Sequence, residues 1–484
     1  MSPPLISKAA ARYTGAGGKE HCSLCRHFSP RRGGRCARVL GDISPMGWCK
    51  LFSREMRGLV ADASSFNGGG GGPALGLDFM QPGSLDPSIT FTRASTATYF
   101  DSAGVMQTAA TNAPRWDYDP ATLALRGLLI EEARTNVIVS SAAISGANWQ
   151  QVAVTATAGQ TGAPDGTAAF TRVVETTATG AHYVGTLMTI AASTAYTLSV
   201  FARAQQSRYL QLALDDGSAN GAHATFDLQT GTISGPLTAH AAGVIGTASI
   251  VPVSGGTYRC AITTTIGAFT SGRVLLLMSN VAAPGFAPSY AGNSANGLLI
   301  WGAQLEVGAF ATSYIPTTSA AVTRAQDRCS ISAANMVPWF NALTGSWFAE
   351  FVFQNPTSPN IRILASLGQP AGGSAGMVFV DPAQHVAQYD GGTALVTTSP
   401  ALVVNAVSKA ASTWAAGTGQ VCGNGGAVLS GAMPTGFGNL SVVGICFLIP
   451  SNPGVTDNAT GYLRRASYWS RVLTAAEMQT VTTL

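Results

Sequence analysis

Short runs in which apolar and polar residues alternate recur along most of the chain. Between residues 137 and 316 they include YTLSVFARA (196–204), TYRCAITTTI (257–266) and GLLIWGAQLEVG (297–308). A period of two residues is that of a strand with one buried face, and short strands separated by glycine-rich turns are typical of a β-sandwich. This stretch therefore predicts a jelly-roll-like sandwich, and similar runs in residues 317–484 predict a second sandwich.

The segments before the first sandwich have a different pattern. Residues 76–136 contain the hairpin-like sequence ATYF–DSAG–VMQT, which predicts a β-hairpin connecting segment. Residues 61–75 include five consecutive glycines, so they are interpreted as a linker. Residues 1–60 form a separate N-terminal module. At the other end, TAAEMQTVTTL predicts one helical turn, with Thr474 and Glu477 in the positions of a capping box.

Composition supports a mostly β protein. Only 10% of the residues are charged and 56 are glycine, which is typical of a tightly turned β fold and not of a disordered chain. No apolar run approaches the roughly 20 residues of a membrane-spanning helix, and MSPPLISKAAARY lacks the apolar core of a secretory signal. We therefore expect synthesis in a cytoplasm, no membrane span and no nucleic-acid partner.

Four of the eight cysteines, Cys22, Cys25, Cys36 and Cys49, lie close together near the N-terminus. The spacing C-x2-C-x10-C-x12-C suits a [4Fe–4S] cluster or a tetrahedral zinc ion, because both take thiolate ligands. Two isolated cysteines in place of a second CxxC favour iron, and so do Trp48 in GWC and Tyr13 upstream, since aromatic side chains shield a cluster from water. Zinc is the first alternative, for which His21 and His27 offer a mixed site with the cysteines, and free or disulfide-bonded thiols are the second.

The metal would also staple the module, because so small a segment has too little apolar area to fold alone. Residues 1–60 contain eleven Lys and Arg against three acids, a formal charge of +8. Five arginines lie between the cysteine ligands, and we expect them to form a basic docking patch: Arg26, Arg31, Arg32, Arg35 and Arg38.

Residues 10 to 55 resemble the high-potential iron–sulfur proteins, which also place one cluster on a CxxC, a lone cysteine and a terminal GWC. The resemblance implies the four cysteines named above as ligands and Trp48 as part of the shield. An electron-transfer protein with appended binding domains is accordingly one alternative function.

Three stretches of the body resemble known proteins. LDPSITFTRAS and the residues that follow it (85–136) are similar to a segment of bacteriophage tail fibres and head-spike fibres, and residues 296–327 are similar to the end of carbohydrate-binding-module-like jelly rolls. Residues 461–479 resemble the last strand and helical turn of concanavalin A-like or laminin-G-like sandwiches.

These resemblances imply a virion structural protein that attaches to host cell-surface polysaccharide. Its other partners would be capsid, portal or tail proteins, and it would be a homo-oligomer such as a trimer. We expect it to be located in the virion after synthesis in the host cytoplasm.

Glycan sites combine aromatic faces with a few amides and carboxylates. The candidates for such contacts are Trp149, Tyr183 and Tyr209 in the first sandwich and Tyr389 and Asp390 in the second. Trp301 lies in an apolar strand, so we expect it in the core.

No convincing catalytic group is visible in the sequence. GGSAG (372–376) fits a nucleophile-elbow pattern, but a strand and a turn follow it, so Ser374 is expected in a loop. The neighbouring acids Glu131 and Glu132, and likewise Asp215 and Asp216, point to opposite faces of a strand. We therefore expect no enzymatic activity, with a polysaccharide-degrading tailspike as the alternative.

Overall fold

The chain divides into two compact units, residues 1–72 and 73–484. The computed structural model describes the second unit from residue 73 to 484 apart from residues 218–219, 241–243, 266, 269, 337, 355–361, 369–373, 382, 390–393, 397–400, 416, 434–443 and 448–459. In the first unit it describes Gly72 and three short antiparallel strands, β1 (Phe28–Ser29), β2 (Arg35–Cys36) and β3 (Val39–Asp42).

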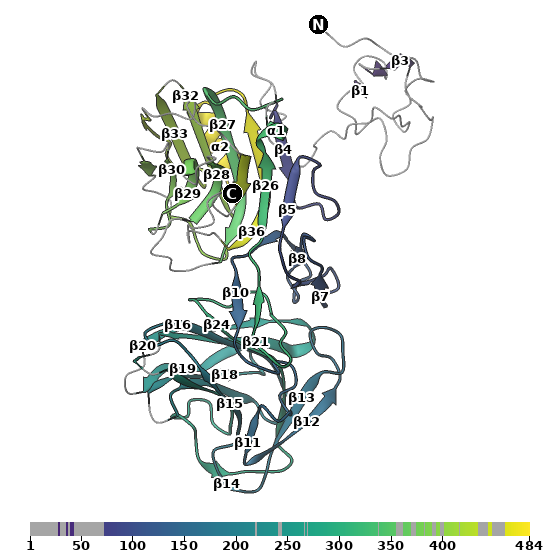
Figure 1. Ribbon diagram of the computed structural model, residues 1–484, viewed down its shortest axis with the longest axis vertical. Helices are drawn as coiled ribbons and strands as arrows, with labels where there is room; N and C mark the ends of the chain where they lie inside the picture. The colour runs from purple at the N-terminus through teal and green to yellow at the C-terminus, as the bar shows by residue number, and fades with distance from the viewer. Residues whose placement is uncertain are drawn as a thin grey trace. The chain divides into compact units, whose positions relative to one another are not determined.

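Two six-stranded antiparallel sheets form the sandwich in the middle of the chain (Figure 1). In spatial order, the first sheet has the strands β11 (Gln150–Val152), β15 (Tyr183–Thr189), β22 (Ser271–Ser279), β17 (Tyr209–Asp215), β18 (Gly221–Asp227) and β19 (Thr232–His240). The second has β12 (Val154–Gln160), β13 (Phe170–Glu175), β24 (Gly297–Val307), β16 (Ala195–Ala204), β21 (Thr257–Thr265) and β20 (Val244–Pro252). We call this sandwich the jelly roll.

Alternation along its strands places the apolar side chains between the two sheets. Leu210, Leu212 and Leu214 of β17 are fully buried there, and they belong to the same cluster as Leu198 and Val200 of β16. Successive side chains of a strand point to opposite faces, so the residues between them lie on the outer faces of the sheets. The predicted mostly β, sandwich-like fold is confirmed.

A second pair of sheets forms the C-terminal sandwich. In spatial order, the strands of its seven-stranded sheet are β31 (Ala394–Val396), β30 (Val386–Tyr389), β29 (Ser374–Val380), β28 (Arg362–Gly368), β35 (Gly444–Phe447), β26 (Arg328–Ser332) and β5 (Ile89–Thr92). Those of its eight-stranded sheet are β34 (Leu429–Ala432), β33 (Thr418–Gly423), β32 (Ser408–Ala415), β27 (Thr344–Phe353), β36 (Gly461–Trp469), β9 (Leu125–Ile130) and β8 (Trp116–Tyr118), with β4 (Leu75–Asp78) also paired to β36. Ser374, which was expected in a loop, is the first residue of β29.

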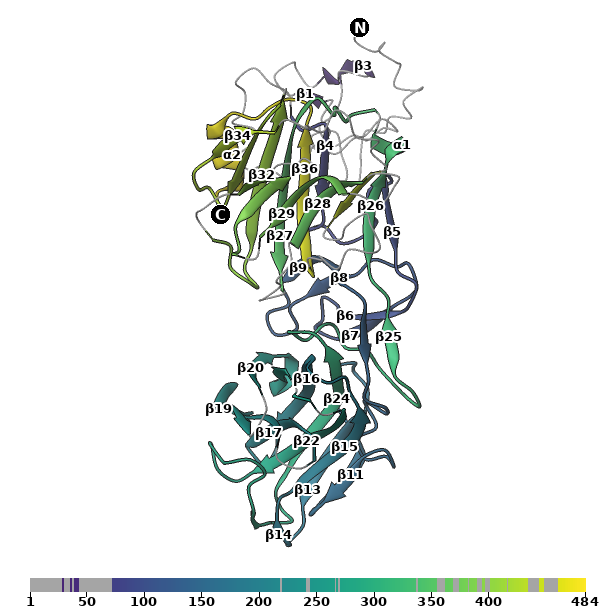
Figure 2. The same cartoon turned by 60° about the vertical axis from the view of Figure 1, so that its left-hand side comes forward.

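Residues 76–136 were predicted to be only a connecting segment, and the strand pairing corrects this prediction. Strand β5 pairs with β26 and strands β4 and β9 pair with β36, so the segment before the jelly roll completes both sheets of the C-terminal sandwich (Figure 2). The jelly roll is therefore an insertion in this sandwich. Its entry strand β10 (Arg134–Asn136) and exit strand β25 (Val322–Arg324) pair antiparallel. Sequence alternation detects strands but does not show their partners.

Short elements complete the second unit. The hairpin β6 (Ala97–Phe100) and β7 (Met106–Ala109) forms where it was predicted. Strands β14 (Thr179–Gly180) and β23 (Tyr290–Ala291) pair, and a 3-10 turn (Ser254–Gly256) and helix α1 (Ala333–Met336) also occur. None of the helices in the described part of the chain has the length and hydropathy of a membrane-spanning helix.

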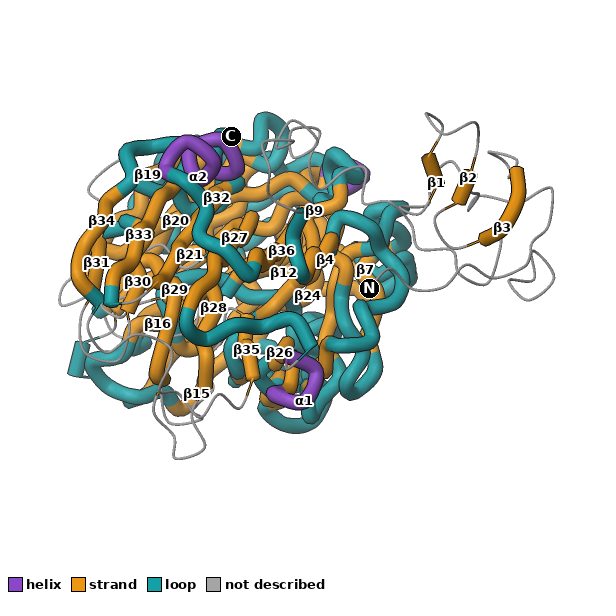
Figure 3. The backbone as a smooth tube through the Cα atoms, turned by 90° about the horizontal axis from the view of Figure 1, so that it is seen from above, coloured by secondary structure: helices purple, strands orange, loops and turns teal. Residues whose placement is uncertain are grey.

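The C-terminal helix α2 (Ala475–Thr482) begins with the predicted capping box. Thr474 Oγ1 accepts from the backbone N–H of Glu477, whose carboxylate accepts from the backbone N–H of Thr474 at 2.7 Å. The helix packs beside β32 and β33 (Figure 3). There Thr482 Oγ1 lies 3.2 Å from Cys422 Sγ.

Candidate functional site

A cleft of about 560 Å³ lies between the jelly roll and the C-terminal sandwich. One wall is the outer face of the jelly roll's second sheet, where Phe201 of β16 is paired with Arg259 of β21, and Arg259 with Val251 of β20. The opposite wall comes from β9, β27 and β36 and from the β8–β9 loop. The cleft has the size of sites that hold small ligands.

Aromatic, apolar and amide side chains line this cleft. The aromatic residues are Phe100, Phe201, Phe310 and Tyr462, and the amides are Gln354 and Asn405. Phe310 is half-buried with the Arg134 guanidinium 5.0 Å from its ring centroid, whereas Phe201 is buried against Trp301 and Tyr314. Trp301 is thus in the core, as predicted.

Arg259 is held on the jelly-roll wall by neutral acceptors. Its Nη1 donates to the Thr312 carbonyl oxygen at 2.6 Å and its Nη2 to Ser199 Oγ at 2.9 Å, while its guanidinium carbon lies 5.3 Å from the Phe201 ring centroid. Burial lowers the pKa of Arg259 below its ordinary value, against the attraction of Glu306. Its charge is therefore poorly solvated.

A hydrogen-bonded network occupies the opposite wall. Tyr462 Oη donates to Asp117 Oδ2 at 2.8 Å and accepts from Arg126 Nη1 at 3.2 Å, and Arg126 Nη2 contacts Asp119 Oδ2 at 2.9 Å. Burial raises the pKa of Asp117 above its ordinary value, although Arg126 opposes the shift. Burial and the neighbouring Asp117 raise the pKa of Tyr462 as well.

The cleft continues into a smaller recess of about 90 Å³. Arg126, Arg259 and Tyr462 line both spaces, whereas Asp117 and Glu131 line only the recess. The deepest part of the site is thus polar and contains two carboxyl groups.

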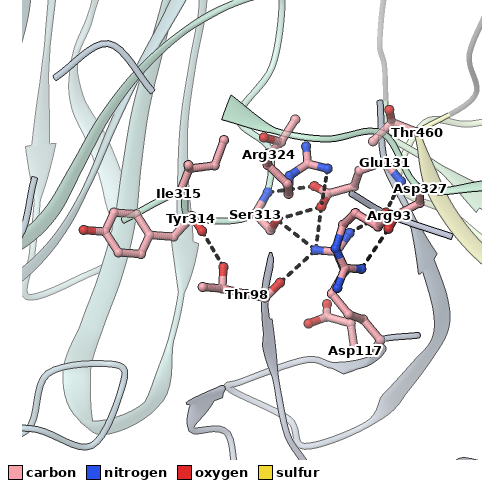
Figure 4. Close-up of polar contacts among 12 residues, drawn as sticks. Arg93, Thr98, Asp117, Glu131, Ser313, Tyr314, Ile315, Arg324, Asp327 and Thr460 are labelled. Carbon is pink, nitrogen blue, oxygen red and sulfur yellow. Dashed lines mark hydrogen bonds and ion pairs between the residues drawn. The ribbon is translucent and has the colours of Figure 1, made fainter. Parts of the chain in front are cut away.

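Behind the recess lies a buried cluster of charges from Arg93, Arg115, Glu131, Arg324 and Asp327. Figure 4 labels four of these residues, Arg93, Glu131, Arg324 and Asp327. Arg115 contacts both carboxylates, Glu131 at 2.8 Å and Asp327 at 2.5 Å, and Arg93 contacts the other oxygen of Asp327 at 2.9 Å. All five side chains are at most 1% exposed. Charges this well buried require partners, and the cluster supplies them.

Both oxygens of the Glu131 carboxylate have partners in this cluster. Its carboxylate accepts from the backbone N–H of Ser313 at 2.7 Å and from Ser313 Oγ at 2.6 Å, in addition to its contacts with Arg115 and Arg324. Burial would raise the pKa of Glu131, but Arg324, Arg115 and the Ser313 hydrogen bonds lower it to about 2. Glu131 is therefore ionised, and its carboxylate holds Ser313, Arg115 and Arg324 in position around the recess.

The predicted glycan contacts do not lie in the cleft. Trp149 is 3% exposed in the jelly-roll core and its Nε1 donates to the Ser140 carbonyl oxygen, so the prediction that it faces a ligand is wrong. The backbone N–H of Trp149 donates to the Gly146 carbonyl oxygen at 3.0 Å, and its side chain belongs to the core cluster of the jelly roll.

Tyr183 and Tyr209 lie together on a different surface. Both are half-buried and point to the outer face of the first jelly-roll sheet, with β22 between their strands. Tyr389 is half-buried at the end of β30, and Asp390 lies outside the described residues. The sequence therefore identified one surface with two aromatic residues, but not the cleft.

The predicted N-terminal sites cannot be placed in the same way. The side chains of Cys22, Cys25, Cys36 and Cys49, of Tyr13 and Trp48, and of Arg26, Arg31, Arg32, Arg35 and Arg38 lie outside the described residues. Within the described part, no three His, Cys, Asp or Glu side chains gather so that they could hold a metal ion. The metal cage and the docking patch remain predictions.

Comparison with known proteins gives partial similarities. No family model matches the chain. A protein described as an iron oxidase, from Acidithiobacillus ferrooxidans, is 44% identical over 48 residues, which are 10% of this chain and about half (51%) of the length of that relative.

Solved structures that are similar to this chain include a CBM40 domain and sialidases. The CBM40 domain of a Ruminococcus gnavus sialidase bound to sialyllactose is 16% identical, with 30% of this chain and 84% of that chain covered and a TM-score of 0.26. A Trypanosoma rangeli sialidase in complex with sialic acid is 9% identical, with 83% and 98% covered and a TM-score of 0.26.

The presence of sialidases among these structures contradicts our expectation that the protein is not an enzyme, because sialidases are glycoside hydrolases. We withdraw that expectation. At these TM-scores the likeness assigns neither an active site nor a substrate to this chain.

Proposed function

We propose that the chain binds glycan in the cleft between its two sandwiches. The observation that carries this proposal is the composition of the cleft, in which aromatic rings and amide side chains surround about 560 Å³. Sugar rings stack on aromatic faces, and amides and charged groups fix their hydroxyls. The two half-buried rings Phe100 and Phe310 are the candidates for stacking.

The test compares the cleft with the Tyr183–Tyr209 surface. Full-length protein is applied to a panel of immobilised polysaccharides, and the dissociation constant of each binder is measured. Phe310→Ala and Gln354→Ala should weaken binding at least about tenfold, or about 1.4 kcal/mol. Tyr209→Ala, the control on the other face, should leave it unchanged. Loss of binding in the control variant alone would move the site out of the cleft.

Hydrolysis of the bound glycan is a second candidate, and the recess favours it. Asp117 and Glu131 line the same space with pKa values shifted in opposite directions. Such a difference is how glycosidases separate a proton donor from an ionised carboxylate. Asp117, with the raised pKa, would be the proton donor.

The same polysaccharides reveal hydrolysis by the appearance of reducing ends. If the polymer is cut, Asp117→Asn should abolish the release and retain binding. Asp119→Asn is the control, because Asp119 lines the outer cleft but not the recess. Binding without any release of reducing ends would exclude the hydrolytic candidate.

We also propose that the chain is part of a phage particle, where it would attach to host polysaccharide. The support is the similarity of residues 85–136 to a segment of bacteriophage tail fibres and head-spike fibres. If the proposal is right, peptides of the chain co-sediment with purified particles in a density gradient. Their recovery only in the soluble fraction would contradict it.

For the N-terminal unit we propose a [4Fe–4S] cluster on Cys22, Cys25, Cys36 and Cys49. The four-cysteine spacing supports it. Thiolates would hold the cluster, and its binding energy would contribute to folding of the module. Zinc on the same thiolates is the competing assignment.

Metal analysis of anaerobically purified full-length protein separates these cases. We expect about four irons and four sulfides per chain and a brown colour. Cys49→Ser should remove the iron, whereas Cys422→Ser, the control, should retain it because Cys422 is buried against α2. Stoichiometric zinc without iron would contradict the cluster.

A further inference from the structure

We propose that the cleft selects an anionic glycan and that Arg259 binds its carboxylate or sulfate group. This inference rests on the proposed glycan binding and goes beyond it by naming the class of sugar. It starts from a difference between Arg259 and the other arginines that line the cleft.

Arg126 and Arg464 already have carboxylate partners. Arg126 contacts Asp119 at 2.9 Å, and Arg464 Nε contacts Glu350 Oε1 at 2.8 Å. Arg259 makes no ion pair with a described residue, and its two hydrogen bonds go to a carbonyl and a hydroxyl oxygen. Of the three arginines that line the cleft, Arg259 is thus the one whose guanidinium contacts no carboxylate of the described residues.

Nearby acids do not replace this partner. Glu306 is the acid that acts most strongly on Arg259, but its carboxylate accepts from the backbone N–H and the hydroxyl of Thr312 at 2.9 and 2.7 Å. Thr312 therefore stands between the two charges, with its carbonyl oxygen bonded to Arg259. Glu306 balances the guanidinium at a distance and leaves its remaining N–H groups unused.

Two of the five N–H donors of Arg259 are used in these bonds, and Nε is buried without a hydrogen-bond partner. A half-buried guanidinium in this state gains most from an anionic acceptor, because charge-assisted hydrogen bonds are shorter and stronger than neutral ones. The site that would supply this acceptor is the cleft and recess that Arg259 lines.

The charged residues that line the cleft also favour an anionic ligand. The outer cleft is lined by three arginines, Arg126, Arg259 and Arg464, and by one carboxylate, Asp119. Because Arg126 and Arg464 are paired with Asp119 and Glu350, Arg259 is the arginine of this lining that has no carboxylate in hydrogen-bond contact among the described residues. A neutral glycan would leave Arg259 partly desolvated and without a hydrogen-bonded anion.

The experiment uses matched pairs of charged and neutral glycans on full-length protein at physiological ionic strength. The pairs are polygalacturonate with its methyl ester, sialyllactose with lactose, and dextran sulfate with dextran. We expect the charged member of at least one pair to bind about tenfold more tightly or better, the effect of one hydrogen bond to a charged group. The pair that responds distinguishes a carboxylate from a sulfate.

Variants then assign the preference to Arg259. Arg259→Gln should remove the preference for the charged member and keep the affinity for the neutral one, and Arg259→Lys should keep part of the preference. Arg203→Gln is the matched control: Arg203 lies on β16 of the same sheet and donates to the Thr161 carbonyl oxygen, but it does not line the cleft.

Equal binding of charged and neutral glycans by the wild-type protein would overturn this inference while glycan binding stands. No binding to any glycan would overturn the proposed function itself. A preference that survives in Arg259→Gln but disappears in Arg203→Gln would place the anion outside the cleft. Because the wild-type comparison needs no variant, a folding defect in Arg259→Gln does not prevent the test.

Discussion

At the scale of single residues, the buried charge cluster holds together segments that are far apart in the sequence. Arg93 and Arg115 precede the jelly roll, Asp327 follows it, and the backbone N–H of Glu131 donates to Asp327 Oδ2 at 2.9 Å. Burial alone would lower the pKa of Arg115, but Asp327 and Glu131 raise it above its ordinary value. The cluster therefore stays ionised and fixes the floor of the recess.

Replacing one member should be costly because its partners remain buried. Glu131→Gln leaves Arg115 and Arg324 without their shared carboxylate, and such a loss costs about 3–5 kcal/mol. The neighbouring Glu132→Gln is the control: its side chain is 21% exposed beside Arg134, so the cost should stay below about 1 kcal/mol. Urea unfolding measures the stability loss of each variant. Equal losses in Glu131→Gln and Glu132→Gln would contradict a special contribution of the buried cluster to stability.

The same residue gives a pH dependence with a defined sign. Since the pKa of Glu131 is lowered to about 2 in the folded protein, its contribution is fully present above its ordinary pKa of 4.5. It is lost progressively as the pH falls from about 4.5 to about 2. The difference in unfolding free energy between wild type and Glu131→Gln should therefore be constant near neutral pH and shrink in that acidic range. If the difference in unfolding free energy at pH 3 is as large as the difference near neutral pH, this prediction is wrong.

At the scale of elements, the C-terminal sandwich depends on strands that come before the jelly roll. Leu75, Leu77, Phe91, Leu128 and Ile130 from these strands lie in its core. Burying side chains of this size stabilises a fold by about 1.5–3 kcal/mol each, so together they match the whole stability of a typical domain. The sandwich cannot be stable without them.

This dependence predicts which fragments fold. Residues 317–484 alone should aggregate or remain partly unfolded, because β26 and β36 lose their neighbours β5, β4 and β9. A chain in which a short Gly-Ser linker replaces residues 137–321 should fold, since Asn136 and Val322 are directly paired. Circular dichroism and the cooperativity of thermal unfolding distinguish the two. Cooperative folding of 317–484 would refute the insertion.

At the scale of the whole second unit, the cleft is a product of this insertion. The jelly roll leaves the sandwich through β10 and returns through β25, and the turn after β24 supplies Phe310 and Ser313 beside β9 and β36. Residues from before, within and after the jelly roll thus meet around one space. Because Glu131 lines the recess, its loss should also affect ligand binding.

The sequence by itself determined the class of fold, the hairpin at residues 97–109, the capping box at Thr474 and the core position of Trp301. These features depend on local periodicity and on neighbours within a few residues, which a sequence displays directly. It also defined the four-cysteine spacing from which the metal proposal starts.

Only the tertiary structure decided which strands pair, and with them the site. Arg115, Glu131 and Asp327 look like scattered charges in the sequence, and nothing local distinguishes Arg259 from other strand arginines. Their roles arise from contacts across as many as 234 residues, between Arg93 and Asp327. Side-chain alternation has the same period whichever strand lies alongside, so it carries no information about such partners.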